Sequence, residues 1–137
     1  MTENFASSAA RHLHDCHGLH DAGRHDNAAY LAGYVAESAL KAVLVAHGVA
    51  AKPYSHDLAT LRGAALELAT LLVPGAHRYR FPASAVFALD AWRPDLRYAE
   101  TGTIDAATAE QFVGAADAVF KRSVAAMIVD GRMEMPR

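Results

Sequence analysis

The sequence predicts an all-α fold, an antiparallel bundle of four main helices with one short helix. Apolar residues recur at steps of three and four along most of the chain, which is the period of one helical face. No segment alternates apolar and polar residues for long enough to make a half-buried strand. At 137 residues the chain has the length of one domain, so we expect a single helical domain over residues 1–137.

The first two helices are predicted from the spacing of their apolar residues. Residues 27–47 are apolar on nearly all sides, which is typical of a central helix that other helices cover. Residues 4–22 carry a single apolar face and end before Gly23, and this face consists of Phe5, Ala9, Leu13, Cys16 and Leu19.

Three more helices complete the predicted bundle. Ser55 is a good N-cap and begins a third helix that reaches Leu72. A short helix is expected over residues 82–89, after the break in VPGAHRYRFP. The last long helix is predicted from Asp105 to near Gly131.

Charge and composition limit the partners and the compartment. The formal net charge is −2 and the pI is near 6.4, so the chain as a whole does not attract a phosphate backbone. Cys16 is the single cysteine, which excludes an intrachain disulfide and fits a reducing compartment. No apolar run of signal length opens the chain, and Glu37 and Lys41 interrupt one of its longest apolar stretches. We therefore expect a cytoplasmic protein that does not span a membrane.

Two charged residues in the second helix are the first candidate site. Glu37 and Lys41 are four residues apart, in the orientation that favours an ion pair. An exposed pair of this kind stabilises a helix by only about 0.3–0.5 kcal/mol. A buried Glu37 would instead need a partner, because an unpaired buried carboxylate is costly. Gly33 lies one turn earlier and leaves open volume, which we expect Arg97 or Trp92 to enter.

The segment WRPDLRY is the second candidate site. It combines aromatic rings with guanidinium groups, which can either close a core or hold a nucleotide, and its candidate residues are Trp92, Arg93, Arg97 and Tyr98. Pro94 disfavours a helical conformation at Arg93, so the chain should turn out of the short helix there. We expect Arg97 to reach Glu37 through two parallel hydrogen bonds, with Trp92 and Tyr98 covering the pair.

Three motifs together carry a resemblance to a known family. They are GRHDNAAYLAGYVAESALKAVL in the second helix, HDLATL at the start of the third and WRPDLRY before the last. Their order and spacing resemble the HEPN domain family of prokaryotic helical bundles, over about residues 5 to 130. The resemblance implies four to five helices, frequent dimerisation, a place in defence or toxin–antitoxin systems and a minimal nucleotidyltransferase as partner.

The resemblance also implies an activity, from which this chain departs. Many HEPN proteins are metal-independent ribonucleases that use an arginine and a histidine with four to six residues between them, near the last helices. Here no histidine follows Arg93 or Arg97, because the last one is His77. Arg11 and His17 have the spacing, but they lie on the first helix and point about 120° apart.

Histidine-rich and basic segments give weaker signals. His17, His20 and Asp21 are spaced for a transition metal, yet His20 falls on the apolar stripe, so we expect no metal site and no cofactor. His56 stands at the start of the third helix. Two roles remain open for it: part of the helix cap, or an acid or base near Glu37. One region is locally basic and interleaved with aromatic residues. We expect it to serve packing and solvation more than the binding of single-stranded nucleic acid. Its residues are His77, Arg78, Tyr79, Arg80, Phe81, Trp92, Arg93, Arg97 and Tyr98.

Two functions remain open at the level of sequence. The first is association without catalysis, as a homodimer and as the partner of a nucleotidyltransferase or toxin–antitoxin component. The second is a ribonuclease or a nucleotide-binding enzyme with an unconventional site around Glu37, Lys41, His56 and Arg97. The missing arginine–histidine motif favours the first.

Overall fold

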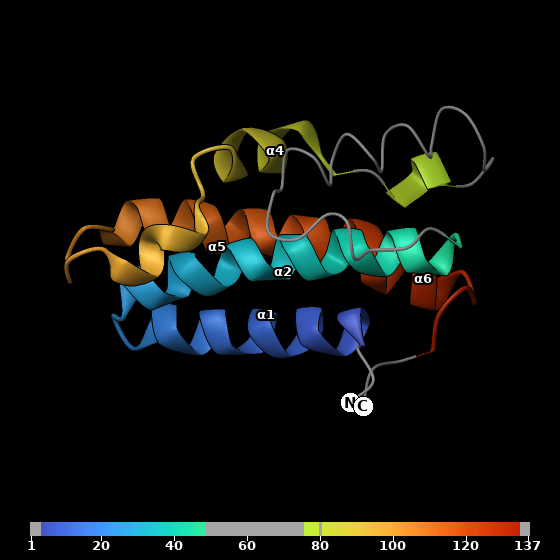
Figure 1. Ribbon diagram of the computed structural model, residues 1–137, viewed down its shortest axis with the longest axis horizontal. Helices are drawn as coiled ribbons and strands as arrows, with labels where there is room; N and C mark the ends of the chain where they lie inside the picture. The colour runs from blue at the N-terminus through green and yellow to red at the C-terminus, as the bar shows by residue number, and fades with distance from the viewer. Residues whose placement is uncertain (1–3, 49–75, 80, 135–137) are drawn as a thin grey trace.

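A computed structural model describes residues 4–48, 76–79 and 81–134, and every regular element in these residues is a helix (Figure 1). The predicted third helix, residues 55–72, lies outside the described residues. The elements in chain order are α1 (Phe5–Asp21), α2 (His25–Ala46), the 3₁₀ helix η2 (Ala76–Tyr79), α4 (Ala83–Leu89), the 3₁₀ helix η3 (Pro94–Tyr98), α5 (Ala106–Phe120), the π-helical turn η4 (Lys121–Ala125) and α6 (Ala126–Val129). The helical class and the four predicted helices that fall within these residues are confirmed.

The long helices α1, α2 and α5 pack against one another, and α4 packs on α5. Figure 1 shows them running along the length of the molecule, with η3 crossing near the start of α2. A tight turn at Gly23, whose φ of +77° suits glycine, reverses the chain between α1 and α2. Side-chain caps begin two of these helices: Asn4 Oδ1 accepts the amide N–H of Ser7, and Asp105 Oδ1 accepts that of Thr108.

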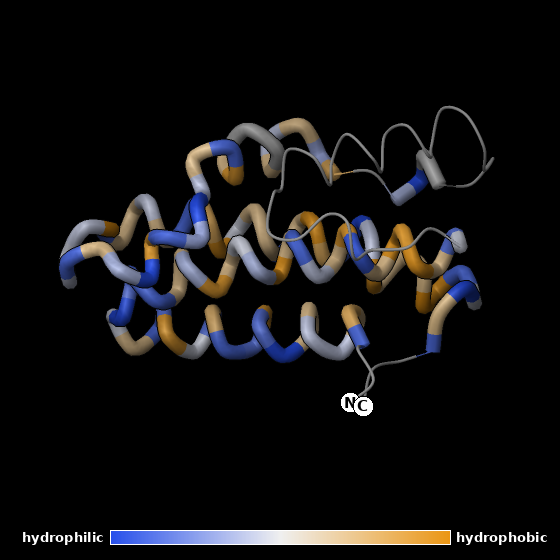
Figure 2. Tube along the Cα trace, viewed as in Figure 1, coloured by the Kyte–Doolittle hydropathy of each residue, from blue (hydrophilic) through white to orange (hydrophobic). Residues whose placement is uncertain are grey.

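Helix α2 is the core helix that the sequence predicts. Most of its residues are buried, from Ala28 to Leu44, and Figure 2 shows apolar residues recurring along α2 and α5. By length and composition α2 could cross a membrane, but 72% of its most apolar window is buried inside the fold, as for the core helix of a helical bundle. Many of the buried residues of α1 and α2 are alanines, whose small side chains permit a close approach of helix backbones; they are Ala6, Ala9, Ala28, Ala29, Ala32, Ala36, Ala39 and Ala42.

The last predicted helix is observed as α5, η4 and α6 in direct succession. At the π turn the Ser123 hydroxyl donates to the carbonyl of Val119, at 2.6 Å, and the side chain is fully buried. A hydroxyl that donates to the carbonyl four residues earlier competes with the regular backbone hydrogen bonds of the helix. The sequence did not predict this turn, because the apolar spacing continues across it.

Gly33 is the point where the segment before η3 meets α2. The indole ring of Trp92 occupies the space in which a Cβ at Gly33 would stand. Trp92 is buried at 4% exposure, and its Nε1–H donates to the carbonyl oxygen of Tyr30 at 3.1 Å. Of the two side chains expected above Gly33, Trp92 is therefore the one that enters.

Gly33→Ala should lower the free energy of unfolding by about 1–3 kcal/mol, since the new methyl group forces the indole out of a packed site. Gly18→Ala on α1 is the matched control. A Cβ there meets nothing within 4 Å, so this change should be neutral or stabilise by up to about 1 kcal/mol through helix propensity. Urea unfolding measures both variants, and equal effects at the two glycines would contradict the assigned contact.

Candidate functional site

One face of α2 gathers the polar and aromatic residues of the first candidate site. Tyr30, Tyr34, Glu37 and Lys41 are spaced by four, three and four residues, so they share that face, and we name them the α2 polar stripe. The hydroxyl of Tyr30 donates to that of Tyr34 at 3.2 Å, and their rings meet edge to face at 5.0 Å. The stripe is continuous from the first turns of α2 to its last third.

Glu37 and Lys41 form a buried pair. Glu37 is 4% exposed, and Lys41 Nζ lies 3.5 Å from its Oε1. The ammonium group also lies 5.7 Å from the centre of the Phe5 ring, which belongs to α1. The interpretation of these two residues as an exposed stripe is therefore wrong, because α1 packs beside them.

Arg97 does not reach Glu37, which corrects the sequence-based expectation. Its guanidinium carbon lies 5.8 Å from the ring centre of Tyr30 and 5.4 Å from that of Tyr98. Tyr30 precedes Glu37 by seven residues, or about 10 Å along the helix. Since η3 crosses the first turns of α2, Arg97 stays exposed there, and Tyr98, which is 81% exposed, does not cover the pair.

The rest of the WRPDLRY segment divides between core and surface. Arg93 has an extended backbone, with φ −140° and ψ 145°, as predicted from Pro94, and its side chain is exposed. Trp92 closes the core and meets the Tyr34 ring edge to face at 5.1 Å. Closure of the bundle thus depends on Trp92, whereas Arg93 and Arg97 remain at the surface.

His12 of α1 is a site residue that the sequence analysis missed. Its ring lies 6.1 Å from that of Tyr34, at the middle of the α2 polar stripe. Burial lowers the pKa of His12, and Arg11 adds to this shift, while Asp15 and Glu37 oppose it. The pKa of Tyr34 is raised, chiefly by burial and by its hydrogen bond with Tyr30. The imidazole of His12 thus lies near the phenol of Tyr34, on the stripe that also holds the Glu37 carboxylate.

Only the packing of α1 on α2 distinguishes His12 from the other histidines of α1. His17 Nε2 lies 2.9 Å from Asp117 Oδ1 of α5. The histidine that has the ribonuclease spacing from Arg11 is therefore hydrogen-bonded to a carboxylate of another helix. His20 Nδ1 faces His25 Nδ1 at 3.2 Å. Within the residues that the structure describes, no three histidine, cysteine or acidic side chains are grouped as metal ligands.

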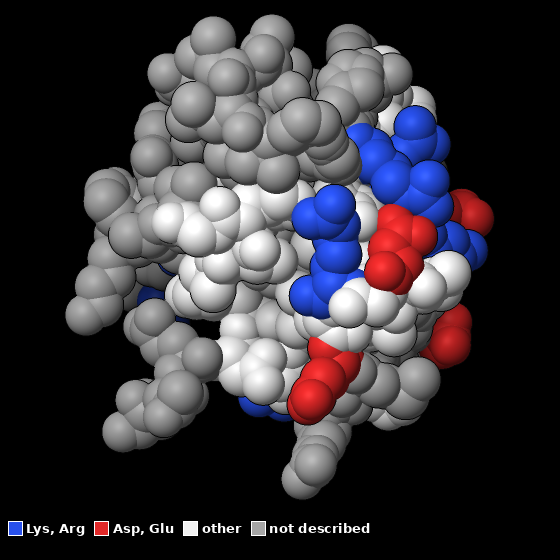
Figure 3. All heavy atoms as spheres, turned by 90° about the vertical axis from the view of Figure 1, so that its right-hand side faces the viewer, with Lys and Arg blue, Asp and Glu red and all other residues white. Residues whose placement is uncertain are grey.

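The locally basic region is mostly structural. Tyr79 is buried at 2% exposure, and its hydroxyl donates to Asp130 Oδ2 at 2.7 Å. The Arg78 guanidinium binds the same carboxylate, with Nε 2.6 Å from Oδ2. Figure 3 shows basic and acidic groups mixed on this end of the molecule. His56, a candidate of the sequence analysis, lies outside the described residues, as does Arg80.

Asp26, in the first turn of α2, holds the loop that follows η3. Its two carboxylate oxygens accept the amide N–H groups of Gly102, at 2.8 Å, and Ile104, at 2.9 Å. These two hydrogen bonds lower the pKa of Asp26 below its ordinary value. The carboxylate therefore stabilises the fold above its unfolded-state pKa, and this contribution disappears as the pH falls through the lower folded-state pKa.

Asp26→Asn should destabilise the protein most at neutral pH. Its difference from wild type should shrink as the pH falls below about 4, because the unfolded state is protonated there and the folded-state carboxylate follows at a lower pH. Urea unfolding at a series of pH values measures this convergence. Asp95→Asn, at an exposed acid of η3, is the control and should have little effect at any pH. A constant deficit of Asp26→Asn down to the acid limit would contradict the assigned role.

The fold and the site define the class of protein: a small helical bundle with a polar stripe on its core helix. The family model of the HEPN domain matches residues 2–126, and the chain therefore belongs to the HEPN domain family. Comparison with curated proteins and with solved structures found no match.

Proposed function

We propose that this HEPN-domain protein acts by association in the cytoplasm, as a homodimer and as the partner of a nucleotidyltransferase or toxin–antitoxin component. The observation that supports it best is an open groove between α4 and α5, whose walls are almost free of charge. The sequence adds that no histidine follows Arg93 or Arg97, so the usual HEPN ribonuclease pair is lacking.

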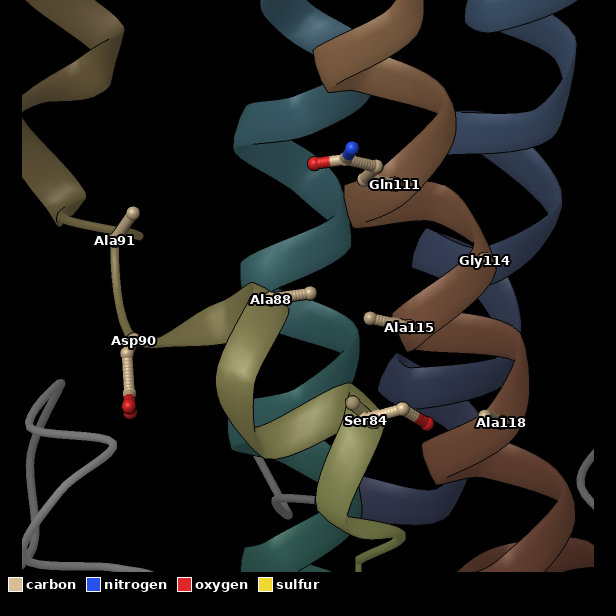
Figure 4. A pocket seen from close by; sticks show the side chains of 9 residues that line it. Ser84, Ala88, Asp90, Ala91, Gln111, Gly114, Ala115 and Ala118 are labelled. Carbon is tan, nitrogen blue, oxygen red and sulfur yellow. The ribbon is translucent and has the colours of Figure 1, made fainter.

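The groove measures about 730 Å³ and is lined mainly by small apolar residues. In Figure 4, Ser84 and Ala88 of α4 point toward α5, and Ala115 and Ala118 of α5 line the opposite wall. Asp90, the one charged residue of the lining, points away from α5. A surface with so little charge can meet a copy of itself without electrostatic repulsion.

Gly114 is the feature of this groove that the monomer does not explain. It lies in the interior of α5, where glycine costs about 1 kcal/mol relative to alanine. Unlike Gly33, it faces no side chain that would require its small size, since a Cβ there meets nothing within 4 Å. Small residues on a helix surface allow another helix to approach closely, so a second copy of α5 is the occupant that we propose.

Gly114→Leu should convert a dimer to a monomer, because the new side chain fills the site of closest approach. Light scattering of the purified chain measures the mass. Gly18→Leu on α1, also at a position with open space around its Cβ, is the control and should keep the wild-type mass. A monomeric wild-type protein, or a Gly114→Leu dimer as stable as wild type, would overturn the association through this groove.

The enzymatic alternative has one observation in its favour, the approach of the His12 ring to Tyr34 on the stripe that holds the buried Glu37. Incubation of labelled RNA with the pure protein in chelator tests it. Cleavage that disappears in His12→Ala and Glu37→Gln would support a ribonuclease at the α2 polar stripe, whereas dependence on Arg97 alone would place the site at η3. Intact RNA would leave association as the function.

A further inference from the structure

The turn that joins α1 to α2 brings two histidine rings together. His20 belongs to the last turn of α1, and His25 is the first residue of α2. Their Nδ1 atoms lie 3.2 Å apart, and the ring centres are 5.1 Å apart with the planes inclined at 60°. Both side chains are half-buried, so a small solute can still reach them.

Backbone hydrogen bonds hold this turn in one conformation. The amide N–H of Arg24 donates to the carbonyl of Leu19 at 2.8 Å, and that of Gly23 donates to the carbonyl of His20 at 3.0 Å. These two bonds form the Schellman motif, in which Gly23 takes the left-handed conformation. The Cα atoms of His20 and His25 therefore keep a fixed relative position, and only two side-chain torsions of each ring are left to adjust.

The separation of the two nitrogen atoms fits a shared metal ion. In a tetrahedral zinc site each ligand nitrogen lies about 2.0–2.1 Å from the metal, which places two such nitrogens about 3.3 Å from each other. The observed distance between His20 Nδ1 and His25 Nδ1 is 3.2 Å. A hydrogen bond between two Nδ1 atoms requires that one of them carries the hydrogen. For both to bind a metal, that ring adopts the other neutral tautomer, with its hydrogen on Nε2.

Two carboxylates favour a cation beside His25. The pKa values of Asp26 and Asp105 are both lowered, chiefly by the hydrogen bonds that these carboxylates accept, and a positive charge on His25 adds to both shifts. A divalent ion held by the His25 ring would experience the same attraction. Arg24 and Arg97 also lie close to His25, but both side chains are exposed, so solvent screens their repulsion.

We propose that His20 and His25 bind one divalent transition-metal ion through their Nδ1 atoms and so link α1 to α2 at this turn. Imidazole nitrogen is a preferred ligand of Zn²⁺, Cu²⁺ and Ni²⁺. Two protein ligands leave the remaining positions of the ion to water or to a small ligand.

The tertiary structure is what pairs these two histidines. From the sequence we expected no metal site, and the candidates there lay on α1 alone. Of these, His17 is hydrogen-bonded to Asp117 of α5. His20 and His25 are five residues apart, and side chains at that spacing on one helix point about 140° away from each other. The turn between the helices removes this divergence.

Calorimetric titration of the full chain with Zn²⁺, without a histidine tag, tests the proposal. We expect saturable binding of one ion per chain, and His20→Ala and His25→Ala should each weaken it at least about tenfold, since even residues that only orient a metal ligand contribute about 10–100-fold to affinity. His14→Ala, at an exposed histidine of α1, is the matched control and should bind like wild type. Circular dichroism verifies that the variants remain folded.

Electron paramagnetic resonance of the wild-type protein with an equimolar amount of Cu²⁺ is a second measurement, which needs no variant. Couplings to two imidazole nitrogens are expected, and coupling to a single imidazole would contradict the site. Loss of zinc binding in only one of the two alanine variants, equal weakening by His14→Ala, or no saturable binding would overturn the proposal. The site shares no residue with the α4–α5 groove, and light scattering in chelator measures the mass separately, so this outcome is independent of the proposed dimer.

Discussion

Trp92→Ala should lower the free energy of unfolding by about 3–5 kcal/mol, the range for removing a buried tryptophan from a packed core. The indole is 4% exposed, fills the space above Gly33 and donates to the carbonyl of Tyr30. Its loss leaves a cavity between α2 and the segment before η3 and removes the hydrogen bond to the carbonyl of Tyr30. Urea unfolding followed by circular dichroism measures the effect without using the single tryptophan as the probe.

Tyr98→Ala is the control for this prediction. Tyr98 belongs to the same segment, but it is 81% exposed, so its removal should change the stability by less than about 0.5 kcal/mol. A large loss at Tyr98, or a loss at Trp92 no larger than that at Tyr98, would contradict the division of this segment into a buried tryptophan and exposed neighbours.

Lys41→Met should cost about 1.5–3 kcal/mol, the range for a hydrogen bond to a charged group, since Lys41 keeps 13% of its side chain exposed and Glu37 makes a further interaction besides this one. The change keeps the length of the side chain and its contact with the Phe5 ring while removing the charge beside Glu37. Arg97→Met is the matched variant. Because Arg97 is exposed and pairs with no carboxylate in the described structure, its loss should cost less than about 1 kcal/mol.

Double-mutant cycles with Glu37→Gln test which of the two cations, Lys41 or Arg97, is coupled to this carboxylate. Residues in one ion pair show interaction energies of about 0.5–3 kcal/mol, whereas separated residues add to within about 0.3–0.5 kcal/mol. We expect coupling of Glu37 with Lys41 and additivity with Arg97. The reverse result would restore the arginine pair that the sequence suggested.

The proposed association and the α2 polar stripe use different parts of the molecule. Association depends on the open α4–α5 groove and Gly114. The stripe lies between packed helices, and its variants are tested for stability and for RNA cleavage.

The amino-acid sequence by itself determined the helices and the central place of α2. Apolar spacing, the stop at Gly23 and the cap at Asp105 act within a few residues, so local chemistry is sufficient to define where α1, α2, α4 and α5 run. The small side chain of Gly33 even indicated where a bulky residue would enter. The absence of a histidine after Arg97 is likewise a property of the sequence alone.

Tertiary structure alone decided which of the candidate residues meet. The contact of Trp92 with Gly33, the separation of Arg97 from Glu37 and the approach of His12 to Tyr34 depend on how η3 and α1 cross α2. If η3 crossed α2 one or two turns further along, every apolar residue of α2 would stay on the same helical face. Apolar periodicity therefore does not distinguish Glu37 from Tyr30 as the neighbour of Arg97. The contact between the Nδ1 atoms of His20 and His25 likewise arises from the turn between α1 and α2, and not from a spacing along one helix.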